Sequence, residues 1–267
     1  MTAGMDSASL VLLEDALRKT MASSSGPALD QALAELGWAE MLSEEPDLAI
    51  PLVFRLLGET GAHASVINDV ILETIGGLPG GTPQMPYAGG SWVIWERSEP
   101  AGNPVLGGLP LREVPGGELM RLGEARRALG WWLVGSARAM LALARQHALD
   151  RVQFGKPIAA FQAVRHRLAE TLVAIEGAEA TLAVPVIDSP DLTSILAKAA
   201  AGKAALTAAK HCQQVLGGVG FTEEHELHRH VKRVLVLDGL LGNARELTRQ
   251  VGGGLRARGS APRMVQL

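Results

Sequence analysis

Cysteine and aromatic residues are the scarcest side chains in this sequence. The single cysteine, Cys212, excludes an internal disulfide and a cysteine-rich metal site. Aromatic residues make up only 4% of the chain, whereas hydrophobic residues make up 47%, and Ala and Leu dominate the long segments. The strands of a β-sandwich favour β-branched and aromatic residues, so this balance predicts packed helices instead.

The sequence also lacks a strong charge of either sign and a long apolar run. The formal net charge is −3 with both signs interspersed, which gives no reason to expect nucleic acid or an anionic membrane as a partner. The most apolar stretch, residues 131–144, is interrupted by Arg138 and is too short to span a bilayer. No basic segment followed by an apolar run opens the chain, so we expect no signal peptide and a cytoplasmic protein.

Glycine and proline divide the chain into parts of different character. Residues 1–77 predict a helical domain, and residues 78–118 predict a small β segment in which Gly and Pro separate short apolar runs. Residues 119–251 predict a four-helix bundle, because long helical patterns are joined by short connections. The Gly- and Arg-rich residues 252–267 are expected to form a flexible tail.

Apolar residues at helical spacing locate the individual elements. In the first domain the expected helices are 8–21, 28–41, 48–58 and 63–75. In the bundle they are 119–152, 159–183, 191–216 and 222–250, the third beginning at a Ser189-Pro190 cap. The expected strands are 91–95, 105–106 and 109–111.

Residues 145–169 carry the most specific pattern. Gly155 and Pro157 predict the end of one helix and a tight break before the next. The pattern is Arg151-x-x-Phe154-Gly155-x-Pro157-Ile158, followed by Phe161-Gln162-x-Val164-x-His166-x-Leu168-Ala169. It resembles the C-terminal domain signature of the acyl-CoA dehydrogenases. The resemblance implies an acyl-CoA dehydrogenase-like fold, mainly α, with a strongly reduced middle β segment.

The same resemblance implies a set of residues that bind FAD across a subunit interface. The matching positions are Arg151, Phe154, Gln162, Gln214, Gly217 and Gly218. A guanidinium group suits a diphosphate, and glycines admit a cofactor close to the backbone. Each residue alone could equally be an ordinary surface arginine, core phenylalanine or helix stop. We therefore rest the prediction on the whole set at its spacing.

The position of the family's catalytic base has a different residue. Counting from Gly217-Gly218, the glutamate that removes the substrate α-proton falls on Leu241, and Arg245 replaces a usual glutamine. Leucine cannot take a proton, and losing a positioned base costs about 10²–10⁴-fold in rate. The resemblance thus implies that this chain has no catalytic glutamate of its own.

Two weaker candidates for a base remain open. Some relatives carry the base on the first long helix of the bundle, where the count falls on Ala125 and Glu124 is one residue away. One residue rotates a side chain by about 100° around a helix, so Glu124 is a poor substitute. Asp238 lies three residues before Leu241 on the expected last helix. Arg126 matches a family arginine beside the substrate.

A group of histidines raises the possibility of a metal site. His225, His228 and His230 lie beside Glu224 and Glu226. Neither HExxH nor a Cys/His spacing accompanies them, so we predict no metal.

The resemblance is closest in character to the short, degenerate subunits of actinobacterial heteromeric α2β2 acyl-CoA dehydrogenases that act on steroid side-chain CoA esters. It implies a chain that completes the FAD site of a catalytic partner subunit. It also implies an acyl-CoA substrate and an electron-transferring flavoprotein as acceptor. The alternatives are a self-sufficient homomeric dehydrogenase that uses Glu124 or Asp238, and a helical scaffold without flavin.

Overall fold

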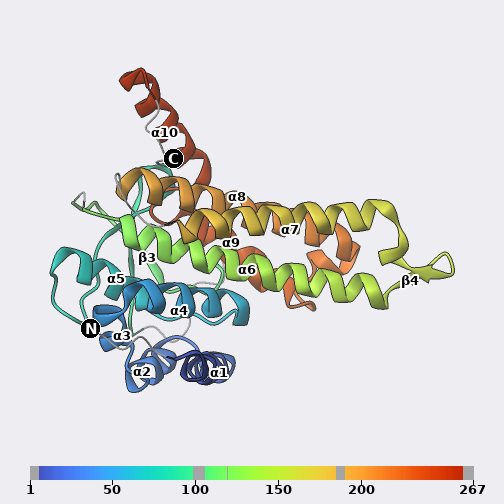
Figure 1. Ribbon diagram of the computed structural model, residues 1–267, viewed down its shortest axis with the longest axis horizontal. Coiled ribbons are helices and arrows are strands. Elements are labelled where there is room, and N and C mark those ends of the chain that lie inside the picture. The colour runs from blue at the N-terminus through green and yellow to red at the C-terminus, as the bar shows by residue number, and fades with distance from the viewer. Residues whose placement is uncertain (1–5, 99–105, 119, 185–189, 261–267) are drawn as a thin grey trace.

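The computed structural model describes residues 6–98, 106–118, 120–184 and 190–260, and it confirms the mainly helical class (Figure 1). The N-terminal helices are α1 (Ser7–Ser23), α2 (Pro27–Glu35), α3 (Trp38–Glu44), α4 (Pro46–Thr60) and α5 (Val66–Ile75). The expected helix at 28–41 is in fact two helices. Gly37 separates them with a φ of 81°, a left-handed conformation that ends a helix.

A small antiparallel sheet follows these helices. Its strands are β1 (Met85–Pro86), β2 (Trp92–Trp95) and β3 (Leu111–Val114), in the order β1-β2-β3. A short 3-10 turn, η1 (Ala88–Gly90), connects the first two strands. The strand expected at 91–95 corresponds to β2, whereas residue 105 lies outside the described residues.

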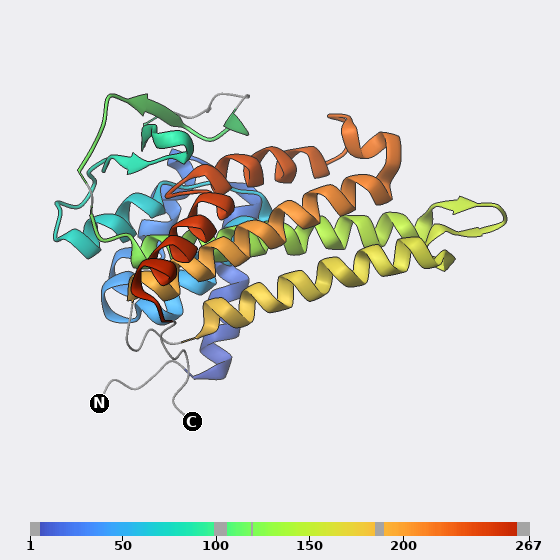
Figure 2. The ribbon, with the colours of Figure 1, turned by 90° about the horizontal axis from the view of Figure 1, so that it is seen from above.

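The long helices are α6 (Gly123–Asp150), α7 (Gln162–Ala183), α8 (Pro190–Leu216), α9 (Leu227–Gly239) and α10 (Ala244–Arg258). The first four lie side by side as a bundle (Figures 1 and 2). Pro190 begins α8, and the expected cap at Ser189 lies outside the described residues.

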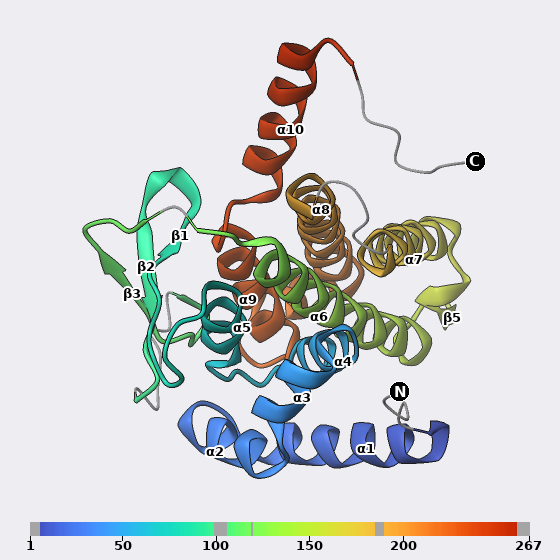
Figure 3. The same ribbon diagram turned by 60° about the vertical axis from the view of Figure 1, so that its left-hand side comes forward.

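The prediction of a single last helix over 222–250 is wrong. The chain turns at Leu240–Asn243, where Leu241 has a φ of 59° and Gly242 a φ of 97°. A new helix then starts at an Asn243–Glu246 capping box, and α10 leaves the bundle (Figure 3).

The expectation of a flexible tail is also wrong for residues 252–258. These residues are the second half of α10, which packs Leu247 and Val251 against Ile195 and Ala199 of α8. The last seven residues of the chain, 261–267, lie outside the described residues.

An aromatic chain joins the three regions in one core. Trp132 of α6 is fully buried, and its ring lies 5.7 Å from Phe54 of α4 and 5.5 Å from Trp95 of β2. Backbone contact between α4 and α6 is close, because a Cβ on Gly135 would lie 2.1 Å from the carbonyl oxygen of Arg55. The N-terminal helices, the sheet and the bundle therefore share one packed interior.

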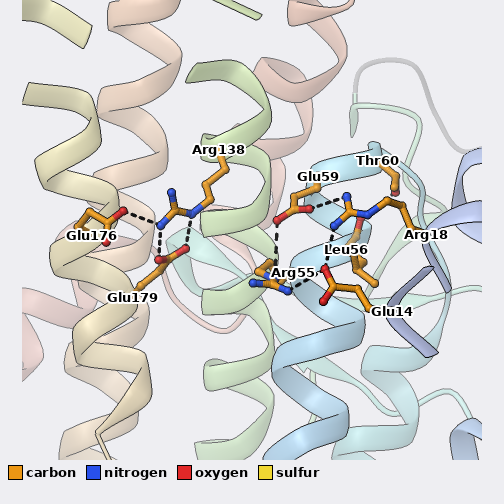
Figure 4. A network of polar contacts seen from close by, with 9 residues as sticks. All are labelled: Glu14, Arg18, Arg55, Leu56, Glu59, Thr60, Arg138, Glu176 and Glu179. Atoms are coloured by element: carbon orange, nitrogen blue, oxygen red, sulfur yellow. Dashed lines mark hydrogen bonds and ion pairs between the residues drawn. The ribbon is translucent and has the colours of Figure 1, made fainter. Parts of the chain in front are cut away.

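Ion pairs brace the helices on either side of α6 (Figure 4). Arg138 of α6 pairs with Glu176 and Glu179 of α7. On the other side, Arg18 of α1 pairs with Glu59 of α4 at 2.8 Å. The Arg138 pairs thus join α6 to α7, and the Arg18 pair joins α1 to α4.

Candidate functional site

The break between α6 and α7 is a β-hairpin that projects from the end of the bundle (Figures 1 and 2). Its strands are β4 (Val152–Gln153) and β5 (Lys156–Pro157). Phe154 and Gly155 form the two-residue turn with φ values of 52° and 75°. Two successive positive φ values suit a tight hairpin, and glycine at the second position lowers their cost.

Side chains at this hairpin point away from the core. Phe154 is 92% exposed and meets Phe161 edge-on, with ring centroids 6.1 Å apart. The Nζ atom of Lys156 lies 4.6 Å from the centroid of Phe161. Arg151 and Gln162 are exposed at the end of α6 and the start of α7. The hairpin offers a guanidinium group and an aromatic ring to something outside the chain.

The other predicted cofactor residues belong to the same end of the bundle. Gln214 is exposed near the end of α8, and Gly217 and Gly218 open the 3-10 turn η4 (Gly217–Phe221). Helix α8 runs beside α6 in the same direction, so both helices end near the hairpin (Figure 1). We call residues 151–162 and 214–221 the bundle tip.

Nothing inside the chain requires glycine at Gly218. A Cβ added to Gly218 would meet no atom within 4 Å, and its backbone is not left-handed. Gly217 has the left-handed φ of 65° that commonly ends a helix. The backbone at this turn is therefore open to a ligand or a partner.

The position that the residue count assigns to the family's base lies at the other end of α9, in the turn formed by residues 240–243, which we call the base turn. Leu241 is 1% exposed, and its N–H donates to the carbonyl oxygen of Pro86 at 2.8 Å. Leu240 forms a β-bridge with Tyr87. Backbone contacts with Pro86 and Tyr87 therefore hold the base turn, and a buried aliphatic side chain occupies the position where the count predicts the glutamate.

A buried lysine also holds the base turn. Lys198 of α8 is completely buried, and its Nζ donates to the carbonyl oxygens of Asp238 at 2.9 Å and Gly242 at 2.8 Å. Burial lowers the pKa of Lys198 to about 8. The Nε atom of Arg126 donates to the carbonyl oxygen of Leu241 at 3.3 Å, and burial lowers the pKa of Arg126 as well. The predicted substrate arginine thus lies against the base position.

Asp238 is occupied with structural contacts. It is 7% exposed, its Oδ1 accepts a hydrogen bond from the N–H of Ala244 at 3.1 Å, and burial raises its pKa. Gly202 makes room for it, because a Cβ there would lie 2.1 Å from Oδ1. The premise that Asp238 and Leu241 share a helix face is wrong, since α9 ends at Gly239.

Glu124 lies in the first turn of α6 and is half-buried. Its neighbour Ala125, at the position expected from relatives, is 1% exposed and faces the core. The two side chains therefore point in different directions, as one step along a helix requires.

The three histidines do not converge. His225 Nδ1 accepts from the N–H of Leu227, and His228 Nδ1 contacts the carbonyl oxygen of His225. His230 is buried on the inner face of α9, with its ring against Gly61. Within the described ranges, His, Cys, Asp and Glu side chains form no group that could hold a metal ion. Those ranges also contain no helix long and apolar enough to cross a membrane.

Sequence reasoning missed Lys198. Its signal is a lysine in a run of small residues, between Ala197 and Ala201, that otherwise face the core. A charged side chain at a buried helix position needs a partner in the fold.

Comparisons with known proteins identify the family. Residues 119–253 match the family model described as "Acyl-CoA dehydrogenase, C-terminal domain", which is half of the chain. The chain therefore belongs to the acyl-CoA dehydrogenase family.

Individual relatives agree with this assignment. Acyl-CoA dehydrogenase FadE34 of Mycobacterium tuberculosis is 33% identical over 211 residues, which cover 70% of this chain and 29% of that protein. Acyl-CoA dehydrogenase IpdE2 of the same organism is 37% identical over 118 residues, which cover 44% of this chain and 37% of that protein. The chain thus spans about a third of the length of these curated relatives.

Solved structures share the fold at low sequence identity. The ChsE4–ChsE5 complex from Mycobacterium tuberculosis matches with a TM-score of 0.66 and 19% identity, over 98% of this chain and 100% of that chain. The Tcur3481–Tcur3483 steroid ACAD matches with a TM-score of 0.69 and 18% identity, over 94% and 98%.

The bundle tip fits one side of a flavin nucleotide. Arg151 forms no ion pair with any described residue, so its guanidinium group is available to a diphosphate. Phe154 offers an exposed ring, and the backbone at Gly218 is open. The residues present are those that would hold FAD from one side.

Proposed function

We propose that this chain is a subunit of a heteromeric FAD-dependent acyl-CoA dehydrogenase, in which its bundle tip completes the FAD site of a catalytic partner subunit. One observation carries the proposal: the six predicted cofactor residues share an exposed end of the bundle, while the base position is buried leucine. An exposed, outward-pointing half-site is useful only if a second chain supplies the remainder.

The roles of the residues follow from their chemistry. Arg151 would pair with the diphosphate, and Gln162 and Gln214 would hydrogen-bond to polar groups of the cofactor. Phe154 would cover an apolar part of it and exclude water. When bound, FAD accepts a hydride from the β-carbon of an acyl-CoA. The partner subunit supplies the base for the α-proton, because Leu241 cannot.

The substrate proposed for the complex is an acyl-CoA with a bulky, steroid-like acyl group, and the proposed electron acceptor is an electron-transferring flavoprotein. A steroid ACAD and the ChsE4–ChsE5 complex both share the fold of this chain, which supports this choice. The small three-stranded sheet would leave more room beside the bundle than a full middle domain.

The test is a flavin spectrum of co-expressed chains. The chain is produced with the acyl-CoA dehydrogenase encoded next to it, purified through a tag on this chain alone, and its visible absorption recorded. We expect a yellow complex with about one FAD per heterodimer, since each shared site needs both chains. Arg151→Ala should bleach the complex without dissociating it.

Arg145→Ala is the matched control, because Arg145 is an exposed arginine on the same helix outside the predicted cofactor set. It should leave the complex yellow. A yellow homomer of this chain alone would contradict the proposal and would redirect attention to Glu124 and Asp238.

A further inference from the structure

A groove of about 880 Å³ lies between α8 and α10, away from the bundle tip. Helix α10 leaves the bundle beside α8 (Figure 3). Its lining includes Lys203, Leu206 and Lys210 of α8, Leu235 of α9, and Arg245 and Arg249 of α10. The proposed function makes no use of this groove.

Positive charge lines both walls of the groove. Lys203 and Lys210 are two turns apart on α8, about 10 Å at the rise of an α-helix. Arg245 and Arg249 are one turn apart on α10. All four are exposed, and none belongs to an ion pair among the described residues. Asp238 is the one acidic side chain among the lining residues, so the basic side chains outnumber it and the walls favour an anionic occupant.

The base of the groove is apolar. Leu235 is 58% exposed although it lies in the middle of α9, and Leu206 and Tyr87 contribute further apolar surface. An apolar floor between charged walls fits an amphipathic occupant, with apolar side chains below and carboxylates at the sides.

The start of α10 disfavours a phosphate group as that occupant. Its free N–H groups, which could bind a phosphate, are already used: Ala244 donates to Asp238 at 3.1 Å and Glu246 to Asn243 at 2.8 Å. The carboxylate of Glu246 also accepts from the N–H of Gly89 at 3.0 Å. The N–H groups of Ala244 and Glu246 are thus not available to a phosphate, and an anionic occupant would contact the basic side chains of the walls instead.

We infer that the groove between α8 and α10 binds an acidic amphipathic helix of the partner subunit. This inference rests on the proposed function, because it requires the heteromer. The lysines, spaced by seven residues, and the arginines, spaced by four, match carboxylates that recur every one or two turns along a bound helix. The contact fixes the assembly, whereas the bundle tip contacts the flavin.

Charge reversal in the co-expressed complex tests the inference. Lys203→Glu and Lys210→Glu should each weaken the association of the two chains by about tenfold, and the loss should shrink at high salt. Lys19→Glu is the control: it makes the same charge change on an exposed site of α1 and should leave the affinity unchanged. Thermal unfolding of each variant chain establishes that it is folded.

Zero-length carbodiimide cross-linking locates the contact directly. We expect Lys203 or Lys210 joined to Asp or Glu side chains of one helical segment of the partner. Wild-type affinity in both reversal variants, or cross-links confined to other lysines, would overturn the inference.

Two further outcomes separate this inference from the proposed function. A complex that fails to form with the wild-type chain contradicts the proposed function itself. If the chain alone binds ADP or FAD, and Lys203→Glu abolishes that binding while partner affinity is unchanged, the groove is a nucleotide site and the inference is wrong.

Discussion

At the bundle tip Phe154 leaves 92% of its side chain exposed, whereas at the base turn Leu241 leaves 1%. The Phe154 ring meets its own chain edge-on at Phe161. The base turn is held by Lys198, Arg126, Pro86 and its own capping box. Two parts of one family site are thus built in opposite ways.

The proposed function accounts for this difference as the loss of one role and the retention of another. Leucine at the base position contributes to the core, so the turn remains folded without its chemistry. The tip gains nothing from its exposed phenylalanine unless another molecule covers it. We therefore expect the tip to contact another molecule and the base turn to contribute to the stability of the chain.

The buried interior should respond strongly to acid, and the tip should not. His63 and His230 are buried, and burial lowers the pKa of each to about 4, with Arg233 nearby adding to the effect. Above pH 6.5 both imidazoles are neutral in the folded and the unfolded chain. Between pH 6.5 and 4 only the unfolded chain takes up these protons, so the stability falls as the pH falls.

The expected loss is about 2–3 kcal/mol per histidine by pH 4, since one pKa unit corresponds to about 1.4 kcal/mol. Urea unfolding of the isolated chain at pH 7, 6, 5 and 4 measures it. His63→Gln should reduce the loss of stability between pH 7 and pH 4 by the contribution of one histidine. His166→Gln, at an exposed position on α7, is the control and should leave the slope unchanged. If the free energy of unfolding of the His63 variant falls as steeply with pH as that of the wild-type chain, His63 is not one of the groups responsible.

Removing Lys198 should have the next largest effect. Lys198→Ala leaves a cavity and two buried carbonyl oxygens without their donor, and we expect a loss of about 3 kcal/mol in the free energy of unfolding. Lys198→Met fills most of the volume and isolates the hydrogen-bond contribution. Lys203→Ala, an exposed lysine on the same helix, should change stability by at most about 0.5 kcal/mol. Equal losses for Lys198→Ala and Lys203→Ala would show that the turn does not depend on Lys198.

The sequence was sufficient for the mainly helical class and for most of the helical segments, because Ala- and Leu-rich amphipathic segments have few ways to bury their apolar faces. It was insufficient for the break after Gly239. At that turn Leu240 pairs with Tyr87, which follows β1 about 150 residues earlier, and such a contact has no local signal. The Asn243-x-x-Glu246 capping box was a local signal, and it marks the start of α10.

For the site, fixed spacing predicted Arg151, Phe154 and Gln162 together because the hairpin and its flanking helices are contiguous in the chain. Their use in binding FAD remains a prediction. Spacing could not identify the role of Lys198, because its hydrogen-bond partners are the backbone carbonyl oxygens of residues 238 and 242. Every residue type offers the same carbonyl oxygen, so these two positions carry no sequence signal that points to the lysine. A single sequence does not reveal hydrogen bonds from a side chain to backbone atoms that are distant in the chain.

The smallest effect on stability should come from Phe154→Ala. The side chain is almost fully exposed, so its loss should change the free energy of unfolding of the isolated chain by at most about 0.5 kcal/mol. In the co-expressed complex the same change should release FAD, because the aromatic cover of the cofactor is lost. Val173→Ala, at an exposed apolar position on α7 that is 71% exposed, is the matched control and should retain the flavin. A Phe154 variant that unfolds early would mean that the hairpin supports the chain itself. A variant that keeps full flavin would mean that the tip faces something other than the cofactor, and the contrast between tip and base turn would then concern assembly alone.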